Sequence, residues 1–149
     1  MTAQQDFLID IFELSTNDLC YFAGLFDGEG TIGLARMAKE NSYSFSLSMG
    51  MVSPKAINDL YKAFGGRIKL REYTNPDWRP LYHWYVYGKR AELILRTLLP
   101  FLRVKREEAE LALKMRNYTR RKGFANNRNR LVEQILAIRH KKEEQTDEA

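Results

Sequence analysis

The stretch FAGLFDGEG, residues 22–30, places two carboxylates, Asp27 and Glu29, among three glycines. Carboxylate oxygens suit hard cations such as Mg²⁺, which needs few protein ligands because it keeps several of its waters. Softer ligands are scarce, since the chain has one cysteine, Cys20, and two histidines. A single cysteine excludes a disulfide within the chain and a zinc site built from cysteines. We therefore expect any bound metal ion to have oxygen ligands.

The same stretch ends a helix expected over residues 15–28, STNDLCYFAGLFDG. Each glycine inside a helix costs about 0.5–1 kcal/mol relative to alanine. Helical spacing gathers the small side chains in one stripe, Cys20, Ala23, Gly24, Asp27 and Gly28. Such a stripe lets two helix backbones approach closely, which would offset the cost of the glycines. The chain offers no second small stripe, so we expect a homodimer in which two copies of this helix pack about a two-fold axis and bring both Glu29 side chains together. The alternative is a glycine-rich helix end that leads into a strand.

Periodicity predicts the remaining elements. Strands are expected at 31–40, 43–52, 66–73 and 81–88, because apolar residues alternate there with small or polar ones. Helices are expected at 53–66, 88–102, 104–121 and 131–142, with a polar connector at 123–130. Up to residue 121 the order is α-β-β-α-β-β-α-α, an α+β fold with a four-stranded, mostly antiparallel sheet and helices on one face. Within 31–40 the alternation breaks at Arg36 and Met37, through either a bulge or the end of helix coverage.

The strands separate into an apolar and a polar face. The apolar face comprises Ile32, Leu34, Phe45, Leu47, Met49, Met51, Ile68, Leu70, Tyr82, Trp84 and Val86. The polar face comprises Ser44, Ser46, Ser48, Arg67, Lys69, Arg71, His83, Tyr85 and Tyr87. Hydroxyls and long cations on a twisted sheet suit the base edges and phosphates of a DNA major groove. The alternative is an ordinary solvent-exposed sheet face.

Positive charge gathers toward the C-terminus. Residues 1–102 hold 11 Lys or Arg and 11 Asp or Glu, whereas residues 103–142 hold 13 basic and 4 acidic residues. The final EEQTDEA, residues 143–149, is acidic. A basic segment on a neutral body indicates a polyanionic partner, most simply nucleic acid, or else a solvated basic helix.

Length and hydropathy limit the class of protein. A chain of 149 residues is long enough for one domain with a substantial core. No apolar run approaches the roughly 18–20 residues of a membrane span, and the acidic N-terminus lacks the basic flank of a secretory signal. We expect a soluble intracellular protein with no membrane partner, in a compartment that the sequence leaves open.

FAGLFDGEG resembles the LAGLIDADG motif of homing endonucleases, with Ala, Gly and Leu at its second to fourth positions, Asp at its sixth, an acid at its eighth and Gly at its ninth. The expected element order also matches that family's α-β-β-α-β-β-α core. LLPFLRVKREEAELAL, residues 98–113, is similar to the segment that carries the family's active-site lysine. The resemblance covers residues 16–122 as an endonuclease core. It leaves 1–15 as an N-terminal extension and 123–149 as a basic C-terminal helix with an acidic tail.

The resemblance implies roles for individual residues. Glu29 would ligate the metal together with the carbonyl of Gly28, and Asp27 would support the site. Lys105 would orient the attacking water or stabilise charge on the phosphate. Ser53 stands where many family members carry glutamine, so this part of the catalytic water network is expected to differ.

The implied function is site-specific cleavage of double-stranded DNA by a homodimer at a long, pseudo-palindromic homing target. Mg²⁺ would be the cofactor, with Mn²⁺ as an alternative, because hard cations can neutralise the phosphate and activate water. Two other functions use the same fold: a catalytically silent DNA-binding regulator, and an RNA maturase that aids splicing of its host intron.

Overall fold

The computed structural model describes residues 13–37, 42–117 and 125–147. Their elements, in chain order, are α2 (Thr16–Glu29), β1 (Gly30–Met37), β2 (Ser42–Met51), α3 (Pro54–Phe64), β3 (Arg67–Arg71), β4 (Leu81–Tyr87), α4 (Gly88–Leu98), the short 3₁₀ helix η1 (Leu99–Phe101), α5 (Arg106–Asn117) and α6 (Ala125–Asp147). The expected α+β fold and its element order are confirmed. Most of the expected N-terminal extension lies outside the described residues.

The four strands form one sheet in the order β1-β2-β4-β3, and all three pairings are antiparallel. The register is one-to-one along β1 and β2, from Gly30 opposite Met49 to Met37 opposite Ser42. No bulge therefore interrupts the described part of this pair. The remaining explanation for the broken alternation near Arg36 is that the helices no longer cover the sheet there.

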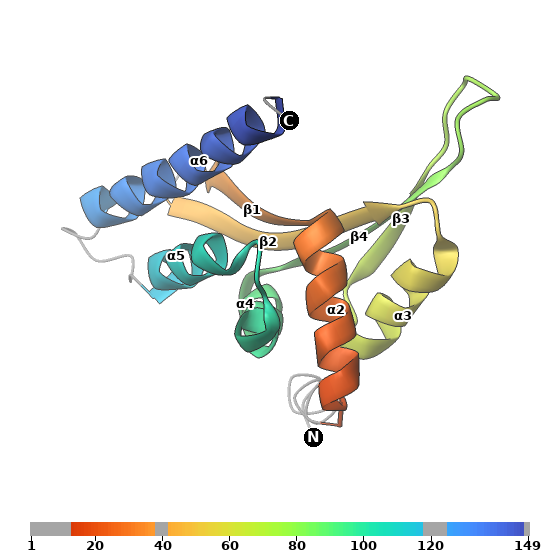
Figure 1. The fold of residues 1–149 in the computed structure, drawn as a ribbon, viewed down its shortest axis with the longest axis horizontal. Helices are drawn as coiled ribbons and strands as arrows, with labels where there is room; N and C mark the ends of the chain where they lie inside the picture. Colours follow the sequence, from red (N-terminus) through yellow and green to blue (C-terminus); the bar gives the residue numbers. More distant parts are fainter. Residues whose placement is uncertain (1–12, 38–41, 118–124, 148–149) are drawn as a thin grey trace.

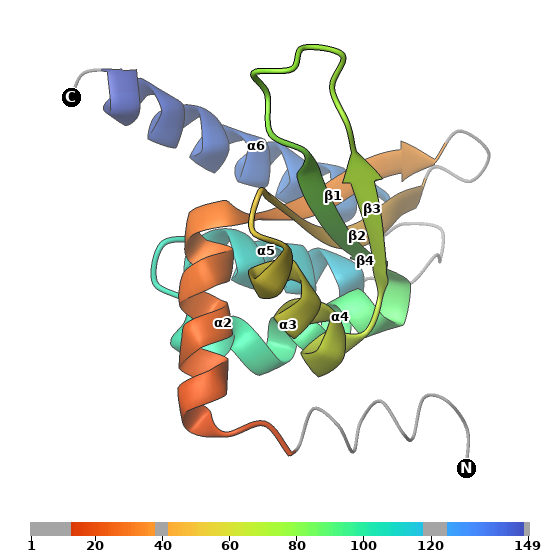
Figure 2. The same cartoon turned by 90° about the vertical axis from the view of Figure 1, so that its right-hand side faces the viewer.

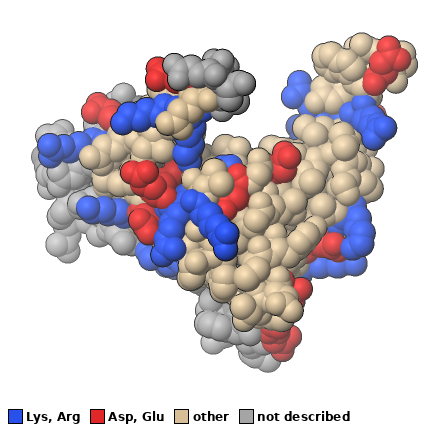
Figure 3. Space-filling model, in the orientation of Figure 1, with Lys and Arg blue, Asp and Glu red and all other residues tan. Residues whose placement is uncertain are grey.

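Helices α2 to α5 lie on one side of the sheet, and α6 runs beside the edge strand β1 (Figures 1 and 2). The loop between β3 and β4 projects beyond the sheet at the other end of the molecule. The opposite face of the sheet borders a hollow that opens between α6 and this loop (Figure 3). This arrangement leaves the polar sheet face uncovered by α2 to α5.

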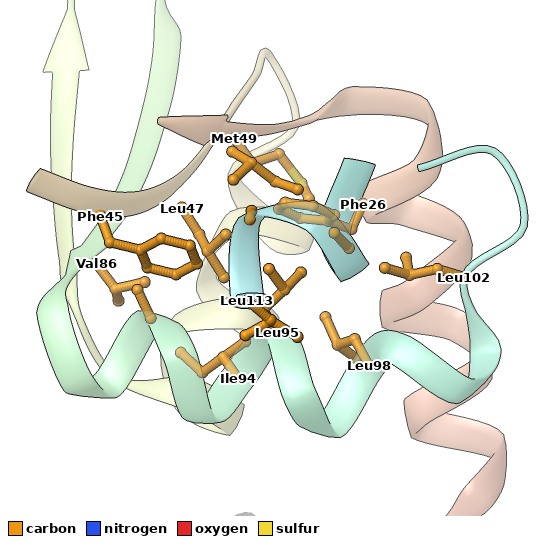
Figure 4. Packing of buried hydrophobic residues seen from close by; sticks show 14 of the residues in the cluster. Phe26, Phe45, Leu47, Met49, Val86, Ile94, Leu95, Leu98, Leu102 and Leu113 are labelled. Atoms are coloured by element: carbon orange, nitrogen blue, oxygen red, sulfur yellow. The ribbon is translucent and has the colours of Figure 1, made fainter. Parts of the chain in front are cut away.

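The core forms between the apolar sheet face and the helices. Phe45, Leu47 and Met49 of β2 point toward α4, whose Leu95 and neighbouring residues are fully buried (Figure 4). The expected division of the strands into two faces is confirmed, because the register aligns buried Leu47 with Ile32 and Val86, which are buried as well.

Local sequence sets the ends of α2. Ser15 and Asp18 form a capping box, in which each side chain accepts a hydrogen bond from the other residue's backbone N–H. The helix passes directly into β1 at Gly30. A Cβ atom at Gly30 would overlap the ring of Phe26, so a glycine is needed for this close approach. The helix-to-strand junction therefore holds Glu29 at a fixed point of the fold.

The C-terminal helix is longer than the sequence predicts. It begins at Ala125, inside the expected connector at 123–130, and it continues to Asp147, within the expected acidic tail. Leu131, Val132 and Ile135 are buried, and α6 packs mainly against α5. Packing of this apolar side extends the helix through polar sequence that periodicity alone assigns to a loop. Within the described residues no helix is long and apolar enough to span a bilayer.

Candidate functional site

The C-terminal end of α2 presents Glu29 and Gly28 to solvent. The last turn of a helix has backbone carbonyls without helical partners, so the Gly28 carbonyl is available there as an oxygen ligand. The exposed Glu29 carboxylate stands one residue farther on. These are the two groups that the resemblance to the LAGLIDADG motif assigns to a metal ion.

Asp27 joins this helix end to the segment that precedes α5. Its carboxylate accepts hydrogen bonds from the backbone N–H groups of Arg103, at 2.8 Å, and Lys105, at 2.9 Å. The Lys105 amine in turn donates to the backbone carbonyl of Asp27 at 2.6 Å. We call these three hydrogen bonds the Asp27–Lys105 clasp. Asp27 therefore acts as a structural acceptor that fixes the loop carrying Lys105.

Lys105 lies half-buried at the same end of α2. Burial lowers the pKa of its amine from the usual 10.5, because the charged form loses water. Glu108, Asp27 and Glu29 oppose this shift in pKa, whereas Lys142 adds to it. The candidate lysine and the candidate metal ligand Glu29 thus belong to the same end of α2, and the charge of Glu29 acts on the Lys105 amine.

A pocket of about 300 Å³ opens beside Lys105. Its walls come from the start of β1, the loop before α5, α5 itself and α6, with the lining residues Gly30, Thr31, Val104, Lys105, Glu108, Arg139, Lys142 and Glu143. Sequence reasoning missed Glu108, Arg139 and Lys142. The sequence offers one indication of these residues, the excess of basic residues in 103–142, and that excess does not show which cation reaches the site.

Two cations of α6 contact the neighbouring segments. Arg139 forms an ion pair with the buried Glu108 of α5 at 2.5 Å and also donates to the carbonyl of Ile32 in β1. Lys142 donates to the carbonyl of Val104 at 2.6 Å. The pocket wall on the α6 side is therefore hydrogen-bonded to both segments that adjoin Glu29 and Lys105.

Ser53 begins α3 as its N-cap. Its hydroxyl accepts a long hydrogen bond, 3.5 Å, from the backbone N–H of Ala56, and Pro54 occupies the first helical position. Among the described residues no hydrogen bond joins Ser53 to Asp27 or Lys105. A cap explains the serine without a catalytic role.

The polar sheet face has the composition that the sequence predicts. The register places Arg67 opposite Tyr85 and Lys69 opposite His83, so these side chains share one face. The same face carries the other predicted members, Ser44, Ser46, Ser48, Arg71 and Tyr87. All three basic residues are exposed, and 62% of Tyr87 is accessible. Lys and Arg side chains also lie on α6 and near the projecting loop, on both sides of the hollow (Figure 3).

The small stripe of α2 is largely uncovered. Cys20, Gly24 and Gly28 are exposed, and a Cβ atom at either glycine would meet nothing within 4 Å. Nothing in the packing of residues 13–37, 42–117 and 125–147 therefore requires glycine at these positions. A hollow of about 390 Å³ lies along the stripe, between α2 and the η1 region. Ala23 differs from the prediction, because it is fully buried in the core and cannot contribute to a contact on the exposed stripe.

A single chain supplies few metal ligands. No group of three or more His, Cys, Asp or Glu side chains that could hold an ion occurs within the described part of the chain. The donors at the end of α2 are hard oxygens, which fit a cation that keeps most of its waters. The residues present therefore fit Mg²⁺ as a shared or mainly hydrated ion.

Solved structures share this architecture. The homing endonuclease I-CvuI in complex with the I-CreI target matches with a TM-score of 0.64 and 19% identity, over 82% of both chains. The archaeal intron-encoded homing endonuclease I-Vdi141I complexed with DNA matches with a TM-score of 0.63 and 14% identity, over 82% of this chain and 84% of that one. I-CvuI with its own target in the presence of Ca matches with a TM-score of 0.53 and 17% identity, over 86% of this chain and 97% of that one.

These likenesses show that the chain has the homing-endonuclease fold, as the motif predicts. No protein-family model matches the sequence, and no curated protein matches it.

Proposed function

We propose that the protein is a site-specific double-strand DNA endonuclease of the homing type. The observation that carries this proposal is the Asp27–Lys105 clasp, which holds Lys105 beside the exposed Glu29. This pair lies where α2 passes into β1, in a fold that the chain shares with homing endonucleases solved in complex with DNA. A protein that only bound DNA would have no need of a carboxylate and an amine in this arrangement.

Glu29 and the Gly28 carbonyl would hold Mg²⁺, which when bound supplies charge neutralisation and a more acidic water. The two I-CvuI structures were determined in the presence of a divalent cation, Mg in one and Ca in the other. Lys105 would stabilise negative charge on the scissile phosphate, because its amine lies at the same helix end and close to Glu29. Asp27 keeps the lysine in place through the clasp rather than contacting the phosphate.

The active form in this proposal is a homodimer. One chain contributes a single Glu29, whereas a double-strand break requires two cuts. The uncovered stripe of Cys20, Gly24 and Gly28 would let two α2 helices meet and bring two copies of Glu29 to one region. A two-fold dimer reads a roughly palindromic target, with one half-site for each chain.

The polar sheet face would contact the major groove of each half-site. Arg67, Lys69 and Arg71 supply long donors in one strand, and Arg can donate two hydrogen bonds to guanine. The serines of β2 and the tyrosines of β4 add shorter donors and acceptors beside them. Lys and Arg side chains of α6 lie on one side of this surface and the β3–β4 loop lies on the other, so phosphates could be contacted along the target (Figure 3).

The decisive experiment selects cleaved sequences from a random double-stranded DNA library in the presence of Mg²⁺. Enrichment of one long, pseudo-palindromic sequence supports the proposal, and a plasmid carrying it should be linearised. If a selected site is bound but not cut with Mg²⁺ or Mn²⁺, the protein is a DNA-binding regulator. Absence of DNA binding together with rescue of intron splicing would identify a maturase.

A further inference from the structure

We propose that the C-terminal helix α6 is a positioning element of the cleavage site, acting through Arg139 and Lys142. This inference rests on the proposed endonuclease function. It assigns to α6 a task distinct from general attraction of DNA by a basic helix. The two residues lie one helical turn apart and contact the strand that follows Glu29 and the loop that carries Lys105.

Arg139 attaches α6 to the strand that follows Glu29. Its guanidinium donates to the carbonyl of Ile32, three residues beyond Glu29, and to the carboxylate of Glu108. The strand is at the edge of the sheet, where outward-facing backbone groups lack a strand partner. The planar fork of an arginine can serve both acceptors at once. Arg139 therefore fixes β1 relative to α5 immediately after the metal-ligand position.

Lys142 attaches α6 to the loop that carries Lys105. Its amine donates at 2.6 Å to the carbonyl of Val104, the residue before Lys105. The backbone N–H of Lys105 is held from the other side by Asp27. The loop is therefore fixed between α2 and α6, and its position depends on both helices.

Together these contacts set the separation between Glu29 and Lys105. On the α2 side, the Asp27–Lys105 clasp holds the loop that carries Lys105. On the α6 side, Lys142 holds the same loop and Arg139 holds β1. A displacement of about 1 Å between catalytic groups can slow a reaction by about a hundredfold. Loss of the α6 contacts should therefore slow cleavage more than it weakens DNA binding.

The first test uses Arg139→Met and Lys142→Met, with Lys141→Met as the matched control. Lys141 is exposed on the same helix and next to Lys142 in sequence, so its removal changes net charge equally. Single-turnover cleavage is measured with the enzyme in saturating excess over target DNA, and affinity is measured without a divalent cation. We expect both test variants to cleave at least about tenfold more slowly than Lys141→Met. Their affinity for DNA should equal that of this control. A loss of affinity that matches the loss of rate would overturn the proposal, because it would make these residues phosphate contacts.

A second variant separates positioning from stability. Arg139→Met leaves the buried Glu108 carboxylate unpaired, which by itself destabilises the fold. The double variant Glu108→Met with Arg139→Met removes both charges and should recover thermal stability. It still lacks the bond to Ile32, so we expect cleavage to remain slow. Recovery of the cleavage rate together with stability would overturn the role of Arg139 in positioning.

A third measurement does not require activity. Amide hydrogen exchange at Arg103 and Lys105 reports how firmly the loop is held against Asp27. We expect faster exchange in Lys142→Met than in Lys141→Met under conditions where both are fully folded. Equal exchange in the two variants would overturn the proposal for Lys142. A wild-type protein that cleaves no DNA would instead refute the endonuclease function, which this measurement does not depend on.

Discussion

The Lys105 amine donates a hydrogen bond of 2.6 Å to the backbone carbonyl of Asp27, while the Asp27 carboxylate accepts one of 2.9 Å from the Lys105 backbone N–H. These reciprocal bonds join residues 78 positions apart in the chain. A cation near the C-terminal end of a helix is also favoured by the helix dipole. The motif aspartate and the lysine segment are thus two halves of one structural unit.

Asp27→Asn tests this unit. The amide keeps one acceptor oxygen but turns an N–H₂ group toward one of the two backbone donors, so the N–H of Arg103 or Lys105 loses its charged partner. We expect the free energy of unfolding to fall by about 1–3 kcal/mol and cleavage to slow. Denaturant unfolding provides the measurement. Asp59→Asn is the control, since that carboxylate forms a surface pair with Lys55, and its loss should cost at most about 1 kcal/mol. Equal stability of Asp27→Asn and the wild type would contradict a structural role for the clasp.

Glu29→Gln tests the metal ligand. The amide keeps the shape of the side chain but is a poorer ligand for Mg²⁺, so we expect cleavage to be abolished while DNA affinity stays close to that of the wild type. Gel-shift and plasmid-cleavage assays on the selected target measure both. The exposed Glu133→Gln on α6 is the charge-matched control and should cleave normally. Cleavage by Glu29→Gln at the wild-type rate would remove Glu29 from the mechanism.

Gly24→Leu tests the dimer. Among the described residues a Cβ atom at this position meets nothing within 4 Å, and leucine favours a helix more than glycine does. We therefore expect the monomer to be as stable as the wild type or more so. In a dimer the added isobutyl groups would separate the two helices, and overpacking of this kind costs typically 1–3 kcal/mol. Analytical ultracentrifugation at matched concentrations should show weaker association.

Asn58→Leu, at an exposed position of α3, controls for added surface hydrophobicity. A monomeric wild type, or an unchanged dimer in Gly24→Leu, would refute an interface at this stripe.

Arg67→Ala, Lys69→Ala and Arg71→Ala test recognition by the sheet. These residues are exposed on one face of β3. Removal of an arginine that contacts guanine should cost about 1–3 kcal/mol of binding free energy and should relax the preference at one base pair. A residue that contacts only phosphate should weaken binding to all sequences and reduce its dependence on salt. Lys62→Ala on α3, on the helical side, is the control. Unchanged binding in all three strand variants would place recognition elsewhere.

Glu92→Gln tests a buried charge that links α4 to α5. Glu92 is buried, and its carboxylate contacts Lys89, Arg96 and Arg116. Burial alone would raise the pKa of Glu92, but Lys89 and Arg96 outweigh it and lower this pKa from the usual 4.5. Since the folded-state pKa lies below the unfolded one, the ionised form stabilises the fold above about pH 4.5, and this contribution is lost as the pH falls through the folded-state pKa.

We therefore expect the unfolding free energy of the wild type to fall more steeply below pH 4.5 than that of Glu92→Gln. Urea unfolding over a series of pH values measures the two slopes, with Glu133→Gln as the exposed control. Parallel slopes for the wild type and Glu92→Gln would show that Glu92 is not a source of acid sensitivity.

The sequence by itself determined the elements and the strand faces. Period-two alternation assigns Leu47 and Lys69 to opposite faces wherever the strands pair, because successive side chains in a strand point to opposite sides. The resemblance of FAGLFDGEG and the PFLRVK segment to the homing-endonuclease motifs likewise singled out Glu29 and Lys105. The helix-to-strand junction also follows locally, since Gly30 must approach Phe26 closely.

Tertiary structure alone decided the neighbours of these residues. Alanine at position 23 is small enough for either a helix contact or the core, and only the packing of α2 on the chain's own interior placed it inside. The start of α6 at Ala125 depended on burial against α5, which local polarity does not reveal. Arg139 reaches Ile32 across 107 positions of the chain. Periodicity describes the faces of one element, whereas a contact of this kind requires the docking of two, and for that reason the sequence did not identify the α6 wall of the site.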